Sequence, residues 1–419
     1  MKYWGIWKKS SITAKIEWGI CTMKEPKRIF TPDCPTVKPL MNLQGMEIAD
    51  FAVKIDAADA SRRMIEKGDA FAREIAERFV ADFEDAQTDQ MVHVTTFAVI
   101  DGTIYMTYYA NVQSEAEDPK YQQARLAYSP VEDPANKTIL IIQQVDDECG
   151  GLPVVMVYDT IFARVDADTL YILWTAKVGD NYYRLYRPFA LSTKKLGEVG
   201  VNRLKIGQTV NDFSATGIRN GLSENGIGCK RMYSDIGIMQ KFTARMEDGV
   251  LYYYTGAYSG DLNMIIKSSD FITWEYVSQP SFGNLSMWEN ATYVIGDKCY
   301  YFVRQQMGSR YGFLTVYHLN EDVWEKPVLV EDCQSRSDFF EYQGNLYMVF
   351  APIDREHIGI LKVDTDNIAG SEVVLQADMQ GSCFYPFINY FTEEELAMSY
   401  TVSRKHVRLA RFDLSKYLD

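Results

Sequence analysis

Side chains that could act together in chemistry lie at the ends of predicted strands in the last third of the sequence. Glu289 precedes one strand, and Arg304 closes the strand that follows. Arg355 precedes a later strand, and Tyr385 precedes the last hairpin. A guanidinium group binds a carboxylate through two parallel hydrogen bonds, which an ammonium group cannot do. The pattern favours a site for an acidic ligand, with two further candidates for ligand contact, Arg336 and Arg404.

Patterns for metal or nucleotide binding do not occur in the sequence. There is no HExxH motif, no Gly-rich phosphate loop and no His/Cys cluster, so we expect no metal site and no cofactor. The seven Cys residues are scattered without a CxxC pair. Such a pattern is typical of reduced thiols in the cytoplasm rather than of a disulfide framework.

The charge of the chain excludes two classes of partner. Its formal net charge is −14, which repels both nucleic acid and anionic lipid, so we expect neither as a partner. The first residues, MKYWGIWKKS, contain no long apolar run and are neither a signal peptide nor a membrane span. We therefore expect a cytoplasmic protein.

A strand–turn–strand unit recurs after residue 90. Each copy has a turn with Gly or Asp and then an apolar strand: DGTIYMTYY at 101, DTLYILWT at 168, DGVLYYYTG at 248, GDKCYYFVRQ at 296, QGNLYMVFAP at 343 and a degenerate EEELAMSYT at 393. The last three intervals are 47 to 50 residues long, close to the length of a propeller blade. We therefore expect an all-β fold, a six-bladed β-propeller over residues 89–419. Five blades, or seven if strands within residues 1–45 complete another, are the alternatives.

Residues 46–88 have a different pattern, that of an amphipathic helix. Apolar side chains recur four residues apart, at Phe71, Ile75, Phe79 and Phe83, and charged residues occupy the other faces. The spacing predicts a helix over about 61–84, either continuous or broken near Gly68. Its apolar stripe should be buried against the propeller or, in a homo-oligomer, against a second subunit.

Two features of the chain resemble the sialidase-like β-propellers. The segment SSDFITW at 268–274 resembles the Asp box of sialidase blade turns, S-x-D-x-G-x-T-W, although it is one residue shorter and lacks the Gly. In such a turn the Asp caps backbone amides and the Trp packs between blades. The order of Glu289, Arg304, Arg355 and Tyr385 is also similar to that of the sialidase blades. The resemblance covers roughly residues 90–415.

The resemblance implies a role for each of these residues. Tyr385 would be the nucleophile and Glu289 its base, and the arginines would hold the carboxylate of a sugar. A neutral Tyr can approach an anomeric carbon that carries a carboxylate, whereas Asp or Glu would be repelled. The family also uses an Asp as acid/base. Here Asp118 is the candidate by spacing, with Glu115 and Glu117 as rivals.

The chain departs from the family pattern in its first blade. The family has an Arg just before its first strand, but the corresponding stretch here is VHVTTF, and His93 stands where that Arg is expected. Without this Arg, binding of a carboxylate in the sialidase manner is in doubt. The Tyr385 and Glu289 pair is unaffected.

The resemblance implies an exo-acting glycoside hydrolase on sialic acid or a related acidic sugar, retaining through a Tyr nucleophile. The alternative is a polysaccharide lyase that acts on uronate-containing glycans with a Tyr/His pair, in which His93 could take part. A non-catalytic glycan-binding propeller is the third hypothesis. In each case the expected partner is a carbohydrate.

Overall fold

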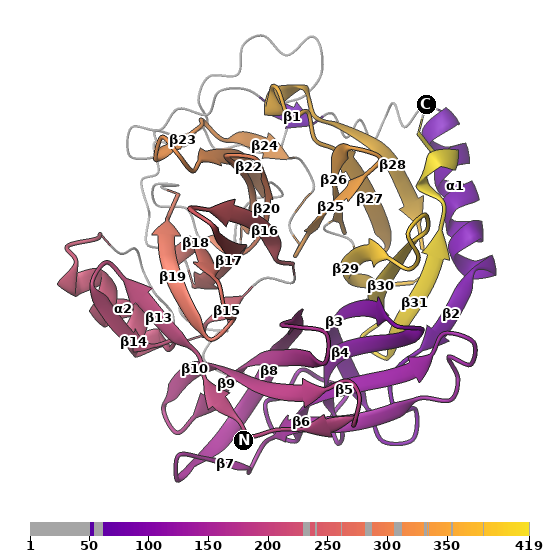
Figure 1. Ribbon diagram of the computed structural model, residues 1–419. Helices are drawn as coiled ribbons and strands as arrows, with labels where there is room; N and C mark the ends of the chain where they lie inside the picture. The colour runs from indigo at the N-terminus through magenta and orange to yellow at the C-terminus, as the bar shows by residue number, and fades with distance from the viewer. Residues whose placement is uncertain are drawn as a thin grey trace, which may run out of the picture.

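The computed structural model describes residues 51–53, 62–228, 235–238, 241–260, 262–280, 287–305, 312–330, 333, 335–352, 355–379 and 381–418. The strands predicted within residues 1–45 lie outside this part of the chain. The described strands form six sheets arranged around a common centre (Figure 1). The expected all-β propeller is therefore confirmed.

The first two sheets follow one another along the chain. The first has the order β3-β4-β5-β6, with β3 Met91–Ile100, β4 Thr103–Asn111, β5 Gln122–Pro130 and β6 Thr138–Gln144. The second consists of β7 Glu148–Cys149, β8 Leu152–Arg164, β9 Thr169–Val178, β10 Asn181–Ala190, β11 Lys195–Leu196 and β12 Gly200–Val201.

The next two sheets are larger. The third contains β13 Arg203–Ile206, β14 Thr209–Asp212, β15 Gly237–Ile238, β16 Thr243–Glu247, β17 Val250–Ser259, β18 Leu262–Ser268 and β19 Thr273–Ser278, with helix α2 Ala215–Glu224 between β14 and β15. The fourth contains β20 Met287–Ile295, β21 Lys298–Gln305, β22 Gly312–His318, β23 Val323–Trp324, β24 Val328–Val330 and, from the N-terminal side, β1 Phe51–Val53.

The last two sheets complete the ring. The fifth contains β25 Asp338–Tyr342, β26 Asn345–Phe350, β27 His357–Lys362 and β28 Glu372–Asp378, with the 3-10 turn η1 Ile368–Gly370 before β28. The sixth contains β29 Cys383–Tyr390, β30 Leu396–Val402, β31 His406–Phe412 and, from before the first sheet, β2 Phe79–Asp82. The 3-10 turn η2 Leu414–Lys416 follows β31.

The conformation of the turn explains why Gly recurs in the repeated unit. Asp101-Gly102, Asp248-Gly249 and Gln343-Gly344 each have two successive residues with positive φ, between 48° and 82°. Two left-handed residues make the type I′ turn, whose twist matches that of the flanking antiparallel strands, and Gly adopts this conformation without a steric penalty. This turn therefore sets the hairpin register at the start of these three units.

The Asp-box-like segment is a structural turn, as its sequence predicts. The Asp270 carboxylate accepts hydrogen bonds from the N–H groups of Ile272 and Thr273, both at 2.8 Å, and the Ser268 hydroxyl donates to Asp270 at 2.9 Å. Trp274 is fully buried in the core between the second and third sheets. The motif thus fixes a turn and an inter-sheet contact, not a site.

The N-terminal helix is shorter than its sequence pattern predicts. Helix α1 spans Arg62–Glu77 without a break, and the backbone from Phe79 onward pairs with β31 as strand β2. Phe71, Ile75 and Phe83 are buried, but Phe79 is 45% exposed. The prediction of a helix to residue 84 with Phe79 on its buried face is therefore wrong. Hydrogen bonding to β31, which no local periodicity reveals, determines the conformation of this segment.

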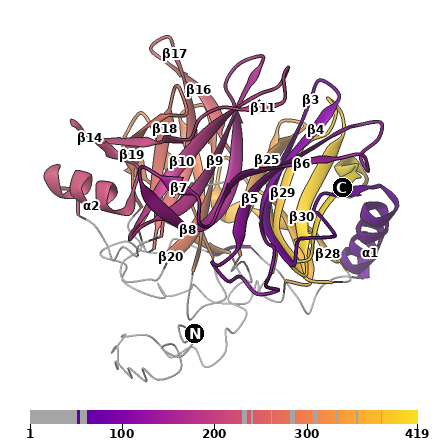
Figure 2. The same ribbon diagram turned by 90° about the horizontal axis from the view of Figure 1, so that it is seen from below.

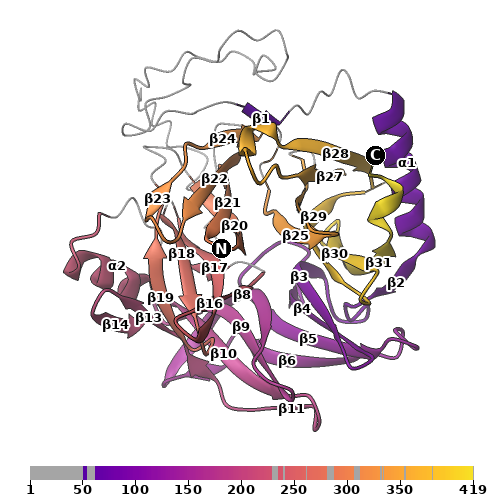
Figure 3. The same ribbon diagram turned by 45° about the horizontal axis from the view of Figure 1, so that its top comes forward.

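Both helices lie on the outside of the ring (Figures 2 and 3). Helix α1 packs against β28 and β31, where a Cβ atom at Gly68 would collide with the carbonyl oxygen of Gln376. Phe71 meets Phe412 and Tyr417 edge-on, with ring centroids 5.3 and 5.4 Å apart. Gly68 therefore marks a close approach, not a helix break. Among the described residues no helix is long and apolar enough to cross a membrane.

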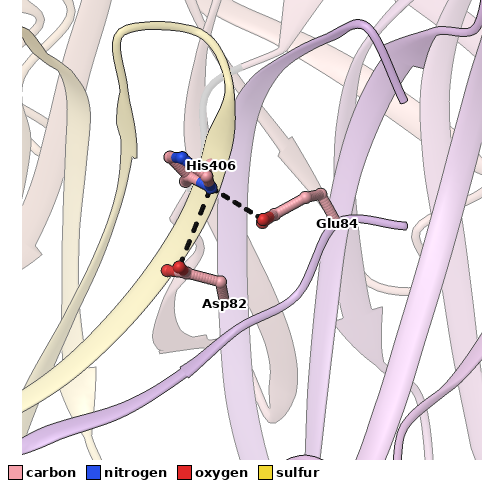
Figure 4. A group of neighbouring side chains, drawn as sticks. All are labelled: Asp82, Glu84 and His406. Atoms are coloured by element: carbon pink, nitrogen blue, oxygen red, sulfur yellow. Dashed lines mark hydrogen bonds and ion pairs between the residues drawn. The ribbon is translucent and has the colours of Figure 1, made fainter. Parts of the chain in front are cut away.

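Side chains on and just after β2 contact residues of β31, near the C-terminal end of the chain (Figure 4). The guanidinium of Arg408 contacts both carboxylate oxygens of Asp82, at 2.9 and 3.1 Å. Glu84 lies 2.8 Å from Nδ1 of His406 and accepts from the N–H of Val407 at 2.8 Å. Asp82, Glu84 and His406 are close enough together to hold a metal ion, but these protein groups already satisfy both carboxylates. The contacts join the two ends of the ring.

Candidate active site

Polar side chains from five sheets converge near the centre of the ring. His93 lies on β3, Asp159 on β8, Glu289 on β20 and Tyr385 on β29, and Arg336 comes just before β25. All five are at least nine-tenths buried. Each of these strands belongs to a different sheet. Five sheets therefore each bring one functional group to the same place.

Backbone irregularities accompany these residues. The pairing register shifts at His93/Thr96, Tyr158/Ile161, Met287/Asn290 and Phe384/Phe387, next to the polar residue of each strand. Val94, Asp159 and Tyr385 have a φ of 52°, a conformation that is costly for residues other than Gly. A bulge re-aims a side chain that a regular strand would direct elsewhere. Strained backbone conformations therefore occur next to the polar residues that converge near the centre of the ring.

Tyr385 and Glu289 come from different sheets and meet here. The Tyr385 hydroxyl donates a hydrogen bond to Oε2 of Glu289 at 3.3 Å. Burial, followed by the charge of Glu289, raises the pKa of Tyr385. Burial by itself would raise the pKa of Glu289, but Arg304, Arg336 and Arg355 hold it below its usual value. The pair is thus a neutral phenol facing an ionised carboxylate.

Arginines surround the Glu289 carboxylate. Nε of Arg304 lies 2.9 Å from Oε2 of Glu289, and Nε of Arg336 lies 3.2 Å from Oε1. Arg336 also donates to Oδ1 of Asp159 at 3.0 Å. With two positive groups on one carboxylate, the buried charge of Glu289 is compensated.

Two further arginines lie over the aromatic rings of β29. The guanidinium of Arg355 is 5.1 Å from the ring centroid of Phe384 and 5.7 Å from that of Tyr385. The guanidinium of Arg404 is 5.1 Å from the Phe384 ring, and Nη1 lies 2.8 Å from Glu117. Arg304, Arg336 and Arg355 therefore surround the same pair, Tyr385 and Glu289. Arg404 lies on the neighbouring Phe384 ring.

His93 stacks on Tyr385. The ring centroids are 4.5 Å apart and the planes are inclined by 25°. Nδ1 lies 3.2 Å from the hydroxyl of Thr401. Burial, and then the charges of Arg404, Arg355, Arg336 and Arg304, hold the pKa of His93 well below its usual value. His93 is therefore a neutral ring in a positively charged site.

The three acid/base candidates of the 115–118 segment lie in different surroundings. Asp118 caps its own turn, accepting from the N–H of Lys120 at 3.0 Å, and Glu115 forms an ion pair with Lys405 at 2.9 Å. Glu117 accepts a hydrogen bond from Tyr109, whose ring packs with His93, and contacts Arg404. Of the three, Glu117 is the residue bonded to the groups around Tyr385.

Known proteins resemble this chain in structure but not in sequence. No family model matches it, and no curated protein matches it. The sialidase of Trypanosoma rangeli in complex with sialic acid has a TM-score of 0.51 and 14% identity, over 77% of this chain and 54% of that one. Hadza microbial sialidase Hz136 has a TM-score of 0.58 and 11% identity, over 79% and 67%. The K499G mutant of NanB sialidase from Streptococcus pneumoniae has a TM-score of 0.50 and 8% identity, over 81% and 71%.

The chain shares the β-propeller fold of these sialidases. It spans about half the length of the Trypanosoma rangeli chain it matches. Identities this low establish the shared fold alone, so the chemistry of this sialidase-like propeller rests on its own side chains.

No sequence motif marks Asp159, Tyr258 or Arg184, which also belong to this site. Asp159 accepts from the Tyr258 hydroxyl at 2.7 Å and from Arg336. Arg184 is fully buried behind it and donates to the Asp159 carbonyl oxygen at 3.1 Å. Burial lowers the pKa of Arg184 to about 10. An Asp within the otherwise apolar strand VYDTIF is unusual and could have marked the position.

Proposed function

We propose that this chain is an exo-acting glycoside hydrolase that acts on sialic acid or a related acidic sugar and retains configuration through Tyr385. We count each of its six sheets as one blade. The observation that carries the proposal is the hydrogen bond from Tyr385 to Glu289 within a cluster of arginines. A phenol of raised pKa needs a base to become a nucleophile, and Glu289 is in contact with it.

The surrounding charges suit an anionic substrate. Arg304 and Arg336 lie against Glu289, and Arg404 lies against Glu117. Arg355 makes cation–π contacts with Phe384 and Tyr385. We assign Arg355 the first contact with a substrate carboxylate, beside the nucleophile. Arg304 and Arg336 keep Glu289 ionised so that it can accept the proton of Tyr385.

A fluorinated sialic acid that traps retaining enzymes tests the proposal. The wild-type chain should release the aryl group from an aryl sialoside, and the trap should leave its mass on the peptide that contains Tyr385. Tyr385→Phe, which keeps the ring but lacks the nucleophilic oxygen, should not be labelled. A label on another peptide, or release at equal rates by the wild type and Tyr385→Phe, would overturn the assignment.

A polysaccharide lyase is the second candidate, because His93 is neutral and stacks on Tyr385. A neutral imidazole can take the proton next to a uronate, while arginines offset the charge of its carboxylate. An unsaturated uronate product, detected by its ultraviolet absorbance, would favour this function over hydrolysis. Glycan binding without either product would favour a binding protein.

A further inference from the structure

Asp235 lies just before β15, the end strand of the third sheet, and the site residues His93, Asp159, Glu289, Arg336 and Tyr385 lie on or just before the corresponding strands of the other sheets. It lies two residues before β15, and the carbonyl oxygen of Ile236 accepts from the Thr175 hydroxyl at 2.7 Å. A Cβ atom on Gly237 would lie 2.8 Å from Oδ2 of Asp159. The backbone after Asp235 is therefore fixed against the Asp159 side of the site.

The carboxyl group of Asp235 differs from the other carboxyl groups here. Glu289 and Asp159 each contact an arginine, as does Glu117. The charged groups that act on Asp235 are instead the carboxylates of Asp159 and Glu289, and its own backbone N–H donates a hydrogen bond to the carboxyl group. The charge of Asp235 in turn helps to raise the pKa of the buried Tyr158. Oδ1 of Asp235 is buried and has no hydrogen-bond partner among the described residues.

These surroundings favour a protonated carboxylic acid. Burial, and then the charges of Asp159 and Glu289, raise the pKa of Asp235 to about 7. Arg336 lies 3.0 Å from the Asp159 carboxylate, whereas Oδ1 of Asp235 has no hydrogen-bond partner among the described residues. Around neutral pH the site therefore contains one ionised base, Glu289, and one acid that still holds its proton, Asp235.

We propose that Asp235 is the general acid of the site. This inference rests on the proposed glycoside hydrolysis. As the bond from the anomeric carbon to the leaving oxygen breaks, that oxygen takes the proton of Asp235. The Tyr385 oxygen forms the new bond to the anomeric carbon, and its proton passes to Glu289. In the second half, the Asp235 carboxylate takes a proton from water as the water oxygen attacks the anomeric carbon. The bond from the anomeric carbon to the Tyr385 oxygen breaks, and that oxygen takes back its proton from Glu289.

Glu117 is the rival acid, and its contacts argue against it. Its two oxygens are already engaged, Oε1 by the Tyr109 hydroxyl and Oε2 by Arg404. Donating a proton from this position would require those contacts to be broken. Asp235 offers an oxygen with no such partner in the described part of the chain.

Dependence on the leaving group tests the proposal. Asp235→Asn and, as a matched control, Glu117→Gln are each assayed on sialyllactose, whose leaving alcohol needs a proton, and on 4-nitrophenyl sialoside, whose leaving phenol does not. Asp235→Asn should lose about 100-fold or more in kcat/KM on sialyllactose and less than about 10-fold on the nitrophenyl substrate. Glu117→Gln should affect both substrates to the same extent.

The pH profile is a second readout. The wild-type rate on sialyllactose should fall as the pH rises through about 7, because Asp235 then loses its proton, and this limb should be absent in Asp235→Asn. Asp159 and Tyr158 on β8 and Glu289 on β20 are the titratable groups that face it. Thermal unfolding verifies that the isosteric variant is folded.

The outcomes separate the acid from the proposed function. A wild type that hydrolyses neither substrate overturns the hydrolase and the acid together. An active wild type whose Asp235→Asn variant loses activity equally on both substrates, or not at all, overturns only the role of Asp235. A leaving-group effect confined to Glu117→Gln would assign the acid to Glu117 instead.

Discussion

The imidazole of His93 lies nearly parallel to the phenol of Tyr385, with centroids 4.5 Å apart, at the centre of four arginines. A cation in place of this ring would add a fifth positive charge next to Arg304, Arg336, Arg355 and Arg404. A neutral ring instead packs against Tyr385, and this contact supports the Tyr385 backbone, whose φ is 52°. His93 thus positions Tyr385, and the arginines supply the positive charge.

The neutral state of His93 predicts how acid affects stability. Its pKa is well below 6.5 in the folded chain, so below pH 6.5 only the unfolded state takes up a proton, and the wild type loses stability as the pH falls. His93→Phe keeps a ring stacked on Tyr385 and removes the proton uptake by His93 in the unfolded state. Its melting temperature should therefore decrease less than that of the wild type between pH 8 and pH 5. Thr401→Val removes the Thr401 hydroxyl that lies beside Nδ1 but keeps the imidazole, and it should show the wild-type dependence.

Removal of the Tyr385 hydroxyl should affect the reaction far more than binding. The hydroxyl is needed along the reaction path, and the rest of the ring stays stacked on His93. Tyr385→Phe should lower kcat by roughly 10²–10⁴-fold with little change in KM. Steady-state kinetics on an aryl sialoside measure both constants. A rise in KM at unchanged kcat would mean that Tyr385 only binds the substrate.

Glu289 should be needed for stability as well as for the reaction. Glu289→Gln removes the carboxylate that Arg304 and Arg336 share, which leaves buried positive charge uncompensated. We expect a loss of about 3–5 kcal/mol in the free energy of unfolding, measured by urea denaturation. Glu115→Gln, at an exposed ion pair with Lys405, is the control and should change stability little. Equal stability of the two variants would contradict this account.

The Glu289 and Arg304 part of the site could be predicted because it is local in sequence. A hairpin brings the start of β20 beside the end of β21, where Met287 pairs with Gln305 and Asn290 with Val303. A Glu near the start of one strand and an Arg near the end of the next must then be neighbours. The repeated turns likewise determine each hairpin from a few residues.

The rest depends on contacts between sheets, which local sequence does not encode. Asp159 and Asp235 belong to no motif, and they meet only because the second and third sheets are adjacent in the ring. Phe79 continues the four-residue spacing of a helix, yet its backbone pairs with β31 from the end of the chain. Such pairing appears only when the ring closes.

Two Phe residues four positions apart, close to the point where the ring closes, should respond differently to substitution. Phe83 is fully buried in the core shared by the first and sixth sheets, and its N–H donates to the Val407 carbonyl oxygen at 2.8 Å. Phe79 is 45% exposed and makes a cation–π contact with Arg408. Phe83→Ala should therefore cost about 3–5 kcal/mol of unfolding free energy, from lost burial and the cavity left behind. Phe79→Ala should cost less than about 1 kcal/mol. Urea denaturation of both variants measures the difference. Equal losses would mean that the helical stripe, with Phe79 on its buried face, describes this segment better than the strand does.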